Sequence, residues 1–232
     1  LPKHAKKVAS WGADAVMIQG GEGGGHTGTV PTTLLLPTVL DAVDIPVIAA
    51  GGFFDGRGLA AALSYGAAGI GMGTRFLLTK DSRVPDAVKQ RYLEADLNGT
   101  VVTAKVDGMP HRMLRTPLVE QVEETSTIKR LAPTIKRTRE FKKMSGMSWI
   151  QLAKDGREMR KAQGRTLNQM ALAANTPMML KAGLVEGDTS AGVLASGQVV
   201  GVIEDLPTCA ELIDRIVIDA AQELRRTQGY LV

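Results

Sequence analysis

A glycine-rich segment with one histidine is the part of this sequence that most clearly suggests chemistry. Residues 20–28 read GGEGGGHTG, and six of the nine are glycine. Because glycine has no Cβ, such a backbone can pass very close to a flat or phosphorylated ligand. His26 is the side chain of this segment that could transfer a proton near neutral pH. The pattern is typical of a cofactor-binding loop that carries its own acid/base group; a flexible linker with an incidental histidine is the alternative.

A short apolar run at residues 15–18 precedes this segment and predicts a strand, and two more apolar runs end in glycines further along the chain. Residues 46–50, PVIAA, are wholly apolar, as in a strand buried on both faces, and they are followed by Gly51 and Gly52. Asp55 is a plausible N-cap for a helix over residues 59–65. Residues 68–72 predict another strand, which ends at Gly73 and Thr74. A helix over residues 34–43 separates the first two strands.

This alternation of strand, loop and helix predicts an α/β fold with a parallel sheet covered by helices. In (β/α)₈ barrels the chemistry lies at the carboxyl ends of the strands, and a phosphate often binds between the last two loops. Gly51, Gly52, Gly73 and Thr74 suit such a pair of loops, since they offer free amides and one hydroxyl. No G-x-G-x-x-G motif opens a helix with an acidic residue about 20 positions later, so a Rossmann fold is disfavoured.

Together the segments GGEGGGHTG, PVIAAGGFFDGRG and GIGMGTRF closely resemble the nitronate monooxygenase (2-nitropropane dioxygenase-like) flavoproteins, which share their framework with the FMN-dependent enoyl reductases. The resemblance is strong over residues 10–80 and weaker at the turn 196–198. It implies that His26 is the active-site histidine and that Ser196 is a tentative hydrogen-bond donor to substrate, with a simple turn as the alternative. The residues that it implies around FMN are Gly24, Gly25, Ala50, Gly51, Gly52, Gly73 and Thr74.

The same resemblance implies an FMN-dependent oxidoreductase that oxidises a nitronate or a similar carbanionic substrate with O₂. The alternative is an NAD(P)H-dependent flavin reductase or dehydrogenase that acts on a coenzyme A thioester. This alternative arises because the extended match, including HRMLRT at residues 111–116, resembles an actinobacterial branch associated with steroid-ring breakdown. An inactive fragment that serves as a binding or assembly module is the third alternative.

The family's barrel has eight strands, whereas this chain carries the pattern of the last three βα units. We therefore expect the C-terminal part of an FMN-binding TIM barrel over residues 1–107. A mostly helical lid or substrate domain is expected over residues 108–195, and a return turn with a C-terminal helix over residues 196–232. The expected partners are a small-molecule substrate, an N-terminal barrel half that this chain lacks, and a second copy in a homo-oligomer.

Composition limits the compartments and the kinds of partner that suit this protein. No apolar run is long enough to span a membrane, no signal peptide is recognisable, and the chain has one cysteine, Cys209. These features predict a cytoplasmic protein without a membrane partner. No nucleic-acid partner is expected, because no recognition motif appears, and no metal site is expected. Cys209 is expected to be a small buried core residue. His111 has two interpretations: it contacts a phosphate, or it lies in an exposed loop.

A basic segment lies between residues 129 and 165, where twelve Lys and Arg accompany three acidic residues. A solvated helical face is one interpretation. A docking surface for polyanionic coenzyme A or NADPH is the other.

Overall fold

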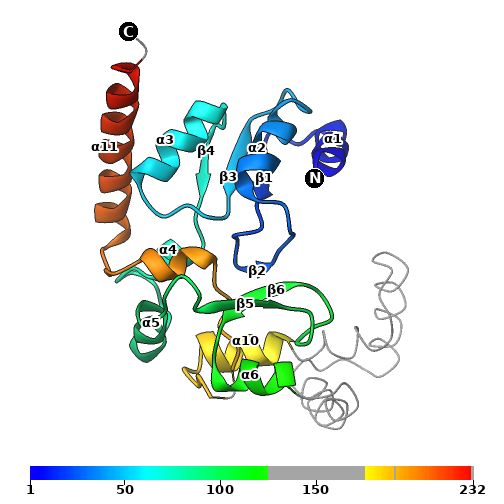
Figure 1. The fold of residues 1–232 in the computed structure, drawn as a ribbon, viewed down its shortest axis with the longest axis vertical. Helices are drawn as coiled ribbons and strands as arrows, with labels where there is room; N and C mark the ends of the chain where they lie inside the picture. The colour runs from blue at the N-terminus through cyan, green and yellow to red at the C-terminus, as the bar shows by residue number, and fades with distance from the viewer. Residues whose placement is uncertain (125–175, 191, 231–232) are drawn as a thin grey trace.

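The computed structural model describes residues 1–124, 176–190 and 192–230. Figure 1 shows two groups of elements: a parallel sheet with its helices in one, and an antiparallel sheet with α6 and α10 in the other. The parallel sheet contains β1 (Val16–Gln19), β3 (Val47–Ala50) and β4 (Gly69–Gly71) in that order. The predicted α/β class is confirmed.

The three parallel strands end at the same edge of the sheet. Gln19 is in register with Ala50, and Ala50 is in register with Gly71. The glycine segments that follow these strands are therefore brought side by side, although they lie far apart in the sequence. This edge is where ligands bind in sheets of this kind.

Helices α1 (Pro2–Ser10) and α2 (Thr32–Leu40) cover the sheet near β1. The core here consists of buried aliphatic side chains: Ile18, Leu35, Leu36, Val39, Val47 and Ala49. Helix α2 begins at Thr32, earlier than predicted, because the Glu22 carboxylate accepts a hydrogen bond from the Thr32 amide at 3.0 Å. That cap comes from the glycine-rich segment, so the local sequence around the helix does not reveal it.

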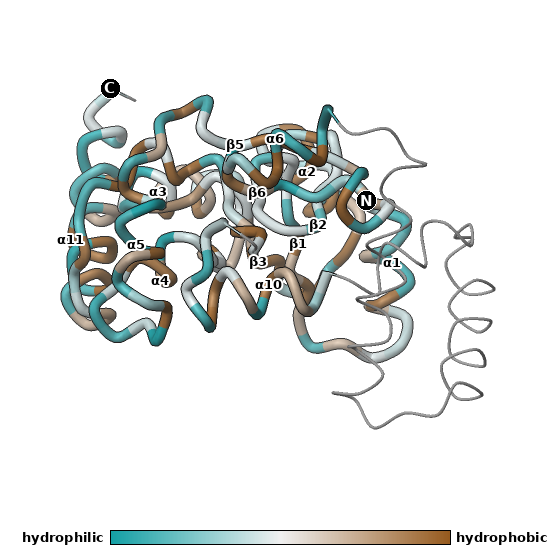
Figure 2. Tube along the Cα trace, turned by 90° about the horizontal axis from the view of Figure 1, so that it is seen from below, coloured by the Kyte–Doolittle hydropathy of each residue, from teal (hydrophilic) through white to brown (hydrophobic). Residues whose placement is uncertain are grey.

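Helix α3 (Gly56–Tyr65) begins where Asp55 accepts a hydrogen bond from the Gly58 amide at 3.0 Å, which confirms the predicted N-cap. Helix α11 (Cys209–Gln228) packs across α3 through Leu212, Ile216 and Ala220, which are spaced four residues apart and buried. Figure 2 shows both apolar and polar residues along α11. Cys209 is only partly buried, with its Sγ 3.6 Å from the Thr79 hydroxyl oxygen.

The antiparallel sheet joins β2 (Gly25–His26), β6 (His111–Leu114) and β5 (Thr100–Thr103) in that order. Residues 108–195 were expected to be mostly helical, and the described part of this range contains the strand β6 in addition to helices. Strand β6 is short, so its hydropathy pattern is weak. Its pairing with β2 is long-range, so the local sequence does not indicate it. It also pairs with β5 across residue 107, where a domain boundary was expected; the three-part division itself remains a prediction.

The remaining elements surround this second sheet. They are α4 (Thr74–Leu77), α5 (Asp86–Leu93), α6 (Pro117–Glu124), α10 (Thr176–Leu184) and the 3₁₀ helix η1 (Gln198–Val202). Met113 of β6 packs with Val119 of α6 and Met179 of α10 in a separate small core.

The described residues form two three-stranded sheets, and the assignment to the last three units of a barrel remains a prediction. The basic segment 129–165 lies outside the described residues. Among the helices that the structure describes, none has the length and apolarity needed to cross a membrane.

Candidate functional site

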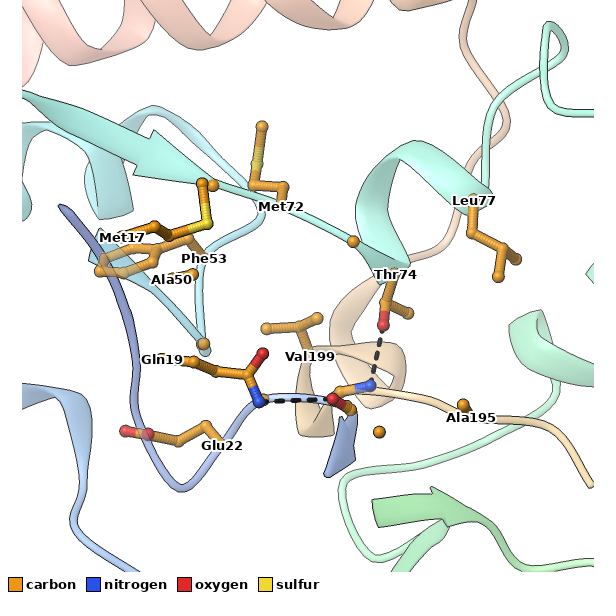
Figure 3. A pocket seen from close by; sticks show the side chains of 18 residues that line it. Met17, Gln19, Glu22, Ala50, Phe53, Met72, Thr74, Leu77, Ala195 and Val199 are labelled. Atoms are coloured by element: carbon orange, nitrogen blue, oxygen red, sulfur yellow. Dashed lines mark hydrogen bonds between the residues drawn. The ribbon is translucent and has the colours of Figure 1, made fainter. Parts of the chain in front are cut away.

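A pocket of about 560 Å³ opens at the edge where β1, β3 and β4 end. Figure 3 shows side chains from β1 and β3, from the segments that follow the three strands, and from residues 195–199 around it. Its volume is in the range of small-molecule sites. All the residues that the family resemblance placed around FMN line this pocket: Gly24, Gly25, Ala50, Gly51, Gly52, Gly73 and Thr74.

The glycines at the pocket give it backbone donors and open space. Gly51 and Gly52 have φ values of +89° and +87°, a left-handed conformation that strongly favours glycine. A Cβ added at Gly73 would meet no protein atom within 4 Å, so the space beside it belongs to the pocket. Within the described part of the chain, no protein group accepts a hydrogen bond from the Gly52 or Gly73 amides. Both amides are available to an anion such as phosphate.

Thr74 adds a hydroxyl to these donors. Its oxygen accepts a hydrogen bond from the Gly197 amide at 2.8 Å, which Figure 3 shows as a dashed line. Because that oxygen accepts, the hydroxyl hydrogen remains available to a ligand. The helix α4, which begins at Thr74, is only four residues long, so its dipole adds little. Amides and this hydroxyl are therefore the main donors.

The glycine-rich segment is held firmly, which excludes the flexible-linker interpretation. The Gly20 amide donates to the Ala50 carbonyl at 2.9 Å and continues the parallel sheet. The side-chain amide of Gln19 donates to the His26 carbonyl at 3.1 Å. From β6, the Arg112 guanidinium donates to the Gly21 carbonyl at 3.0 Å. Burial lowers the pKa of Arg112, and the neighbouring Glu22 carboxylate acts in the opposite direction.

His26 lies at the end of β2 with about half of its side chain exposed. It does not line the pocket, although its neighbour Gly25 does. Its Nε2 is 2.5 Å from Oδ2 of Asp107, and Nδ1 of His111 is 3.1 Å from the same oxygen. The side chains of Asp107 and His111 are only 2–3% exposed. The site thus contains a buried carboxylate between two histidines.

Asp107 is ionised in this arrangement. Burial by itself would raise the pKa of its carboxyl, but hydrogen bonds from His111, the Met109 amide and His26 together lower the pKa below the ordinary aspartate value. Sequence reasoning missed Asp107, because it lies 81 residues from His26 and belongs to no local motif. Both interpretations of His111, a phosphate contact and an exposed loop, are wrong, because the ring is buried against Asp107.

The same three side chains could each offer one atom to a metal ion, since these atoms lie within 4.8 Å of one another. Asp107 Oδ2 nevertheless already has a hydrogen-bonding partner in each histidine.

Ser196 is fully buried, and its hydroxyl donates to the Gly197 carbonyl at 3.0 Å. It does not line the pocket, so its geometry favours a turn over a substrate contact.

Comparison with known proteins supports the family assignment. The sequence model of the nitronate monooxygenase family matches residues 2–219. Two relatives, from Rhodococcus jostii and Mycobacterium tuberculosis, are each 65% identical over 96% of this chain. Both are named (3aS,4S,5R,7aS)-5-hydroxy-7a-methyl-1-oxo-octahydro-1H-indene-4-carboxyl-CoA dehydrogenase. The chain spans 63% and 64% of their respective lengths.

A solved structure, FabK from Thermotoga maritima, superposes on 99% of this chain with a TM-score of 0.72 and 32% sequence identity. The chain covers 61% of that protein. The name of the family and the names of the two relatives all describe oxidoreductases. The chain belongs to the nitronate monooxygenase family, as its motifs predicted.

Proposed function

We propose that this chain is part of an FMN-dependent dehydrogenase that acts on a coenzyme A thioester. Of the two activities that the sequence left open, this is the one named for the two relatives that share 65% of its residues. That identity extends over 96% of the chain, including the elements that form the pocket. This similarity is the observation that carries the choice of substrate class.

The pocket supports a monophosphate flavin as the cofactor. It combines two available amides, at Gly52 and Gly73, with the hydroxyl of Thr74 and with open space beside Gly73. Met17 and Phe53 contribute apolar wall, as the ring system of a flavin needs. FMN would supply, when bound, the acceptor for an electron pair.

His26 is proposed as the base that takes a proton from the substrate carbon. A hydrogen next to a thioester carbonyl leaves as a proton, and a dehydrogenation also needs a hydride acceptor, which is the role given to FMN. Half of the His26 side chain is accessible, and the residue follows the pocket-lining Gly25. A substrate bound at the mouth of the pocket would therefore lie beside His26.

Nitronate oxidation with O₂ is the second candidate, because the family model carries that name. The structure of a nitroalkane oxidase from Streptomyces ansochromogenes also covers 98% of this chain, with 27% identity and a TM-score of 0.68. In both candidates His26 would act beside a flavin, as a base toward the thioester or as an electrostatic partner to the anionic nitronate, so the pocket alone does not separate them.

An anaerobic titration of the natural protein separates the two. The flavin absorbance is followed while the protein is mixed either with the CoA thioester of a saturated, hydroxylated ring acid or with an alkyl nitronate. Free coenzyme A is the control, and NADH or NADPH is added separately to test for a nicotinamide cosubstrate. We expect the thioester to bleach the flavin and the nitronate to leave it oxidised. Bleaching by the nitronate alone would overturn the proposal.

A further inference from the structure

We infer that Asp107 is a positioning residue that fixes His26 as the tautomer protonated at Nε2, so that Nδ1 is the basic nitrogen. This inference deepens the role proposed for His26 and rests on that proposal only for its relevance to catalysis. The geometry comes from β2, which carries His26, and from the loop between β5 and β6, which carries Asp107. The local sequence around His26 does not indicate which side chain contacts its ring.

The direction of the hydrogen bond follows from the charge on Asp107. An ionised carboxylate only accepts hydrogen bonds. The His26 nitrogen that faces Oδ2 at 2.5 Å is Nε2, so Nε2 carries the hydrogen. The other nitrogen of the neutral ring then has a free lone pair. In the resting site, Nδ1 of His26 is therefore the atom that can take a proton.

His111 is fixed by the same carboxylate in the opposite sense. Its Nδ1 faces Oδ2 of Asp107 at 3.1 Å and carries the hydrogen. Its Nε2 is buried and has no hydrogen-bond partner among the described residues. At this buried position, an unprotonated Nε2 without a partner costs less free energy than an unpartnered N–H on a cationic ring would. His111 thus supplies Asp107 with a second hydrogen-bond donor.

A third donor sets the orientation of the Asp107 side chain. The Met109 amide donates to Oδ1 at 3.0 Å, so Oδ1 and Oδ2 are not equivalent. In an Asp107→Asn variant, the amide oxygen would stay with the Met109 N–H and the NH₂ group would take the place of Oδ2. This NH₂ group would then donate toward both histidines. His26 would have to accept at Nε2 and carry its hydrogen on Nδ1, so the basic atom would be lost.

Histidine tautomers can be read directly by ¹⁵N NMR, since N–H and bare ring nitrogens have well-separated shifts. Single substitutions His26→Gln and His111→Gln identify the signals of these two histidines by the loss of their peaks. The spectra are recorded for ¹⁵N-histidine-labelled protein at about pH 9, well above the ordinary histidine pKa of about 6.5. Wild type, Asp107→Asn and the exposed control Asp214→Asn are compared.

We expect His26 to be Nε2–H in the wild type and in Asp214→Asn, and Nδ1–H in Asp107→Asn. His111 should switch from Nδ1–H to Nε2–H in the same variant. A wild-type His26 that is already Nδ1–H would overturn the inference, even if Asp107→Asn failed to fold. An unchanged His26 tautomer in a folded Asp107→Asn would do so as well. The measurement uses neither substrate nor turnover, so failure of the proposed dehydrogenase activity would leave its result standing.

Discussion

The hydroxyl oxygen of Thr74 accepts a hydrogen bond from the amide of Gly197, 123 residues further along the chain, at 2.8 Å. This bond joins the first residue of α4 to the segment that leads into η1, and both line the pocket. A Cβ at Gly24 would come within 2.5 Å of the same amide, which shows how closely the glycine-rich segment approaches. Three distant parts of the chain meet at this point.

Thr74→Val should therefore weaken FMN binding. Valine has nearly the same shape, but it removes the proposed donor to phosphate and leaves the buried Gly197 amide without an acceptor. Hydrogen bonds to charged groups contribute about 1.5–3 kcal/mol, so Kd should rise by roughly 10- to 100-fold. The measurement is a fluorescence titration of FMN into the apoprotein. Thr74→Ser, which keeps the hydroxyl, is the control, and equal affinity of the Val and Ser variants would remove Thr74 from the phosphate site.

Gly73→Val tests whether the open space beside Gly73 belongs to the ligand. A Cβ there meets no neighbouring protein atom within 4 Å, so the variant should fold normally while its branched group fills the pocket. Gly28 is equally uncrowded but lies outside the pocket, which makes Gly28→Val a matched control. We expect flavin content to fall to near zero in the first variant only. Full flavin content in Gly73→Val would place the phosphate elsewhere.

His26→Ala should separate catalysis from cofactor binding. The side chain does not line the pocket, so FMN affinity should stay at the wild-type level. Turnover should fall by about 10²- to 10⁴-fold, the usual contribution of a general base. His4→Ala, on an exposed part of α1, controls for loss of a histidine as such. Steady-state rates of His26→Ala that matched those of His4→Ala would make His26 a structural residue.

A stability measurement tests the ion-pair network of Asp205 with two arginines. Asp205 accepts hydrogen bonds from Arg215 at 2.7 Å and from the buried Arg75 at 2.9 Å. The hydrogen bond from Arg215 is the main cause that lowers the pKa of Asp205; burial opposes it, and the charge of Arg75 adds to it. Because the pKa is lowered in the folded state, Asp205 stabilises the fold above its ordinary pKa, and this contribution is lost as pH falls through the folded-state value.

Asp205→Asn should accordingly be less stable than wild type at about pH 7, and the difference should shrink between about pH 5 and pH 3. Urea unfolding across this range gives the free energies of unfolding. The exposed Asp214→Asn should differ from wild type by little at any of these values. A difference for Asp205→Asn that stayed constant down to pH 3 would show that the carboxylate charge contributes nothing.

The sequence predicts the parallel part of the fold well, because its signals are local. The apolar run that becomes β3 ends at Gly51 and Gly52, and Asp55 caps the helix that follows. These short-range patterns depend on burial and on backbone conformation, both of which residue type reports directly. The residues that line the pocket around the expected cofactor were implied by the family resemblance, which these same segments carry.

The rest could not be predicted, because it depends on contacts between distant residues. Strand β6 has four residues, so its hydropathy alternation is too short to indicate a strand, and it pairs with only two residues of the distant β2. Asp107 and His111 belong to the site only because β6 brings them beside His26. Strand β5, read as Thr-Val-Val-Thr, was detectable in principle from its β-branched residues.

Cofactor identity tests the central claim most directly. The natural protein is purified and denatured, and the released flavin is identified by chromatography and mass spectrometry and quantified against protein. The pocket offers one set of phosphate donors, at Gly52, Gly73 and Thr74, and the sequence contains no dinucleotide-binding motif. We predict FMN at close to one equivalent per chain. Release of FAD, or of no flavin, would contradict the account.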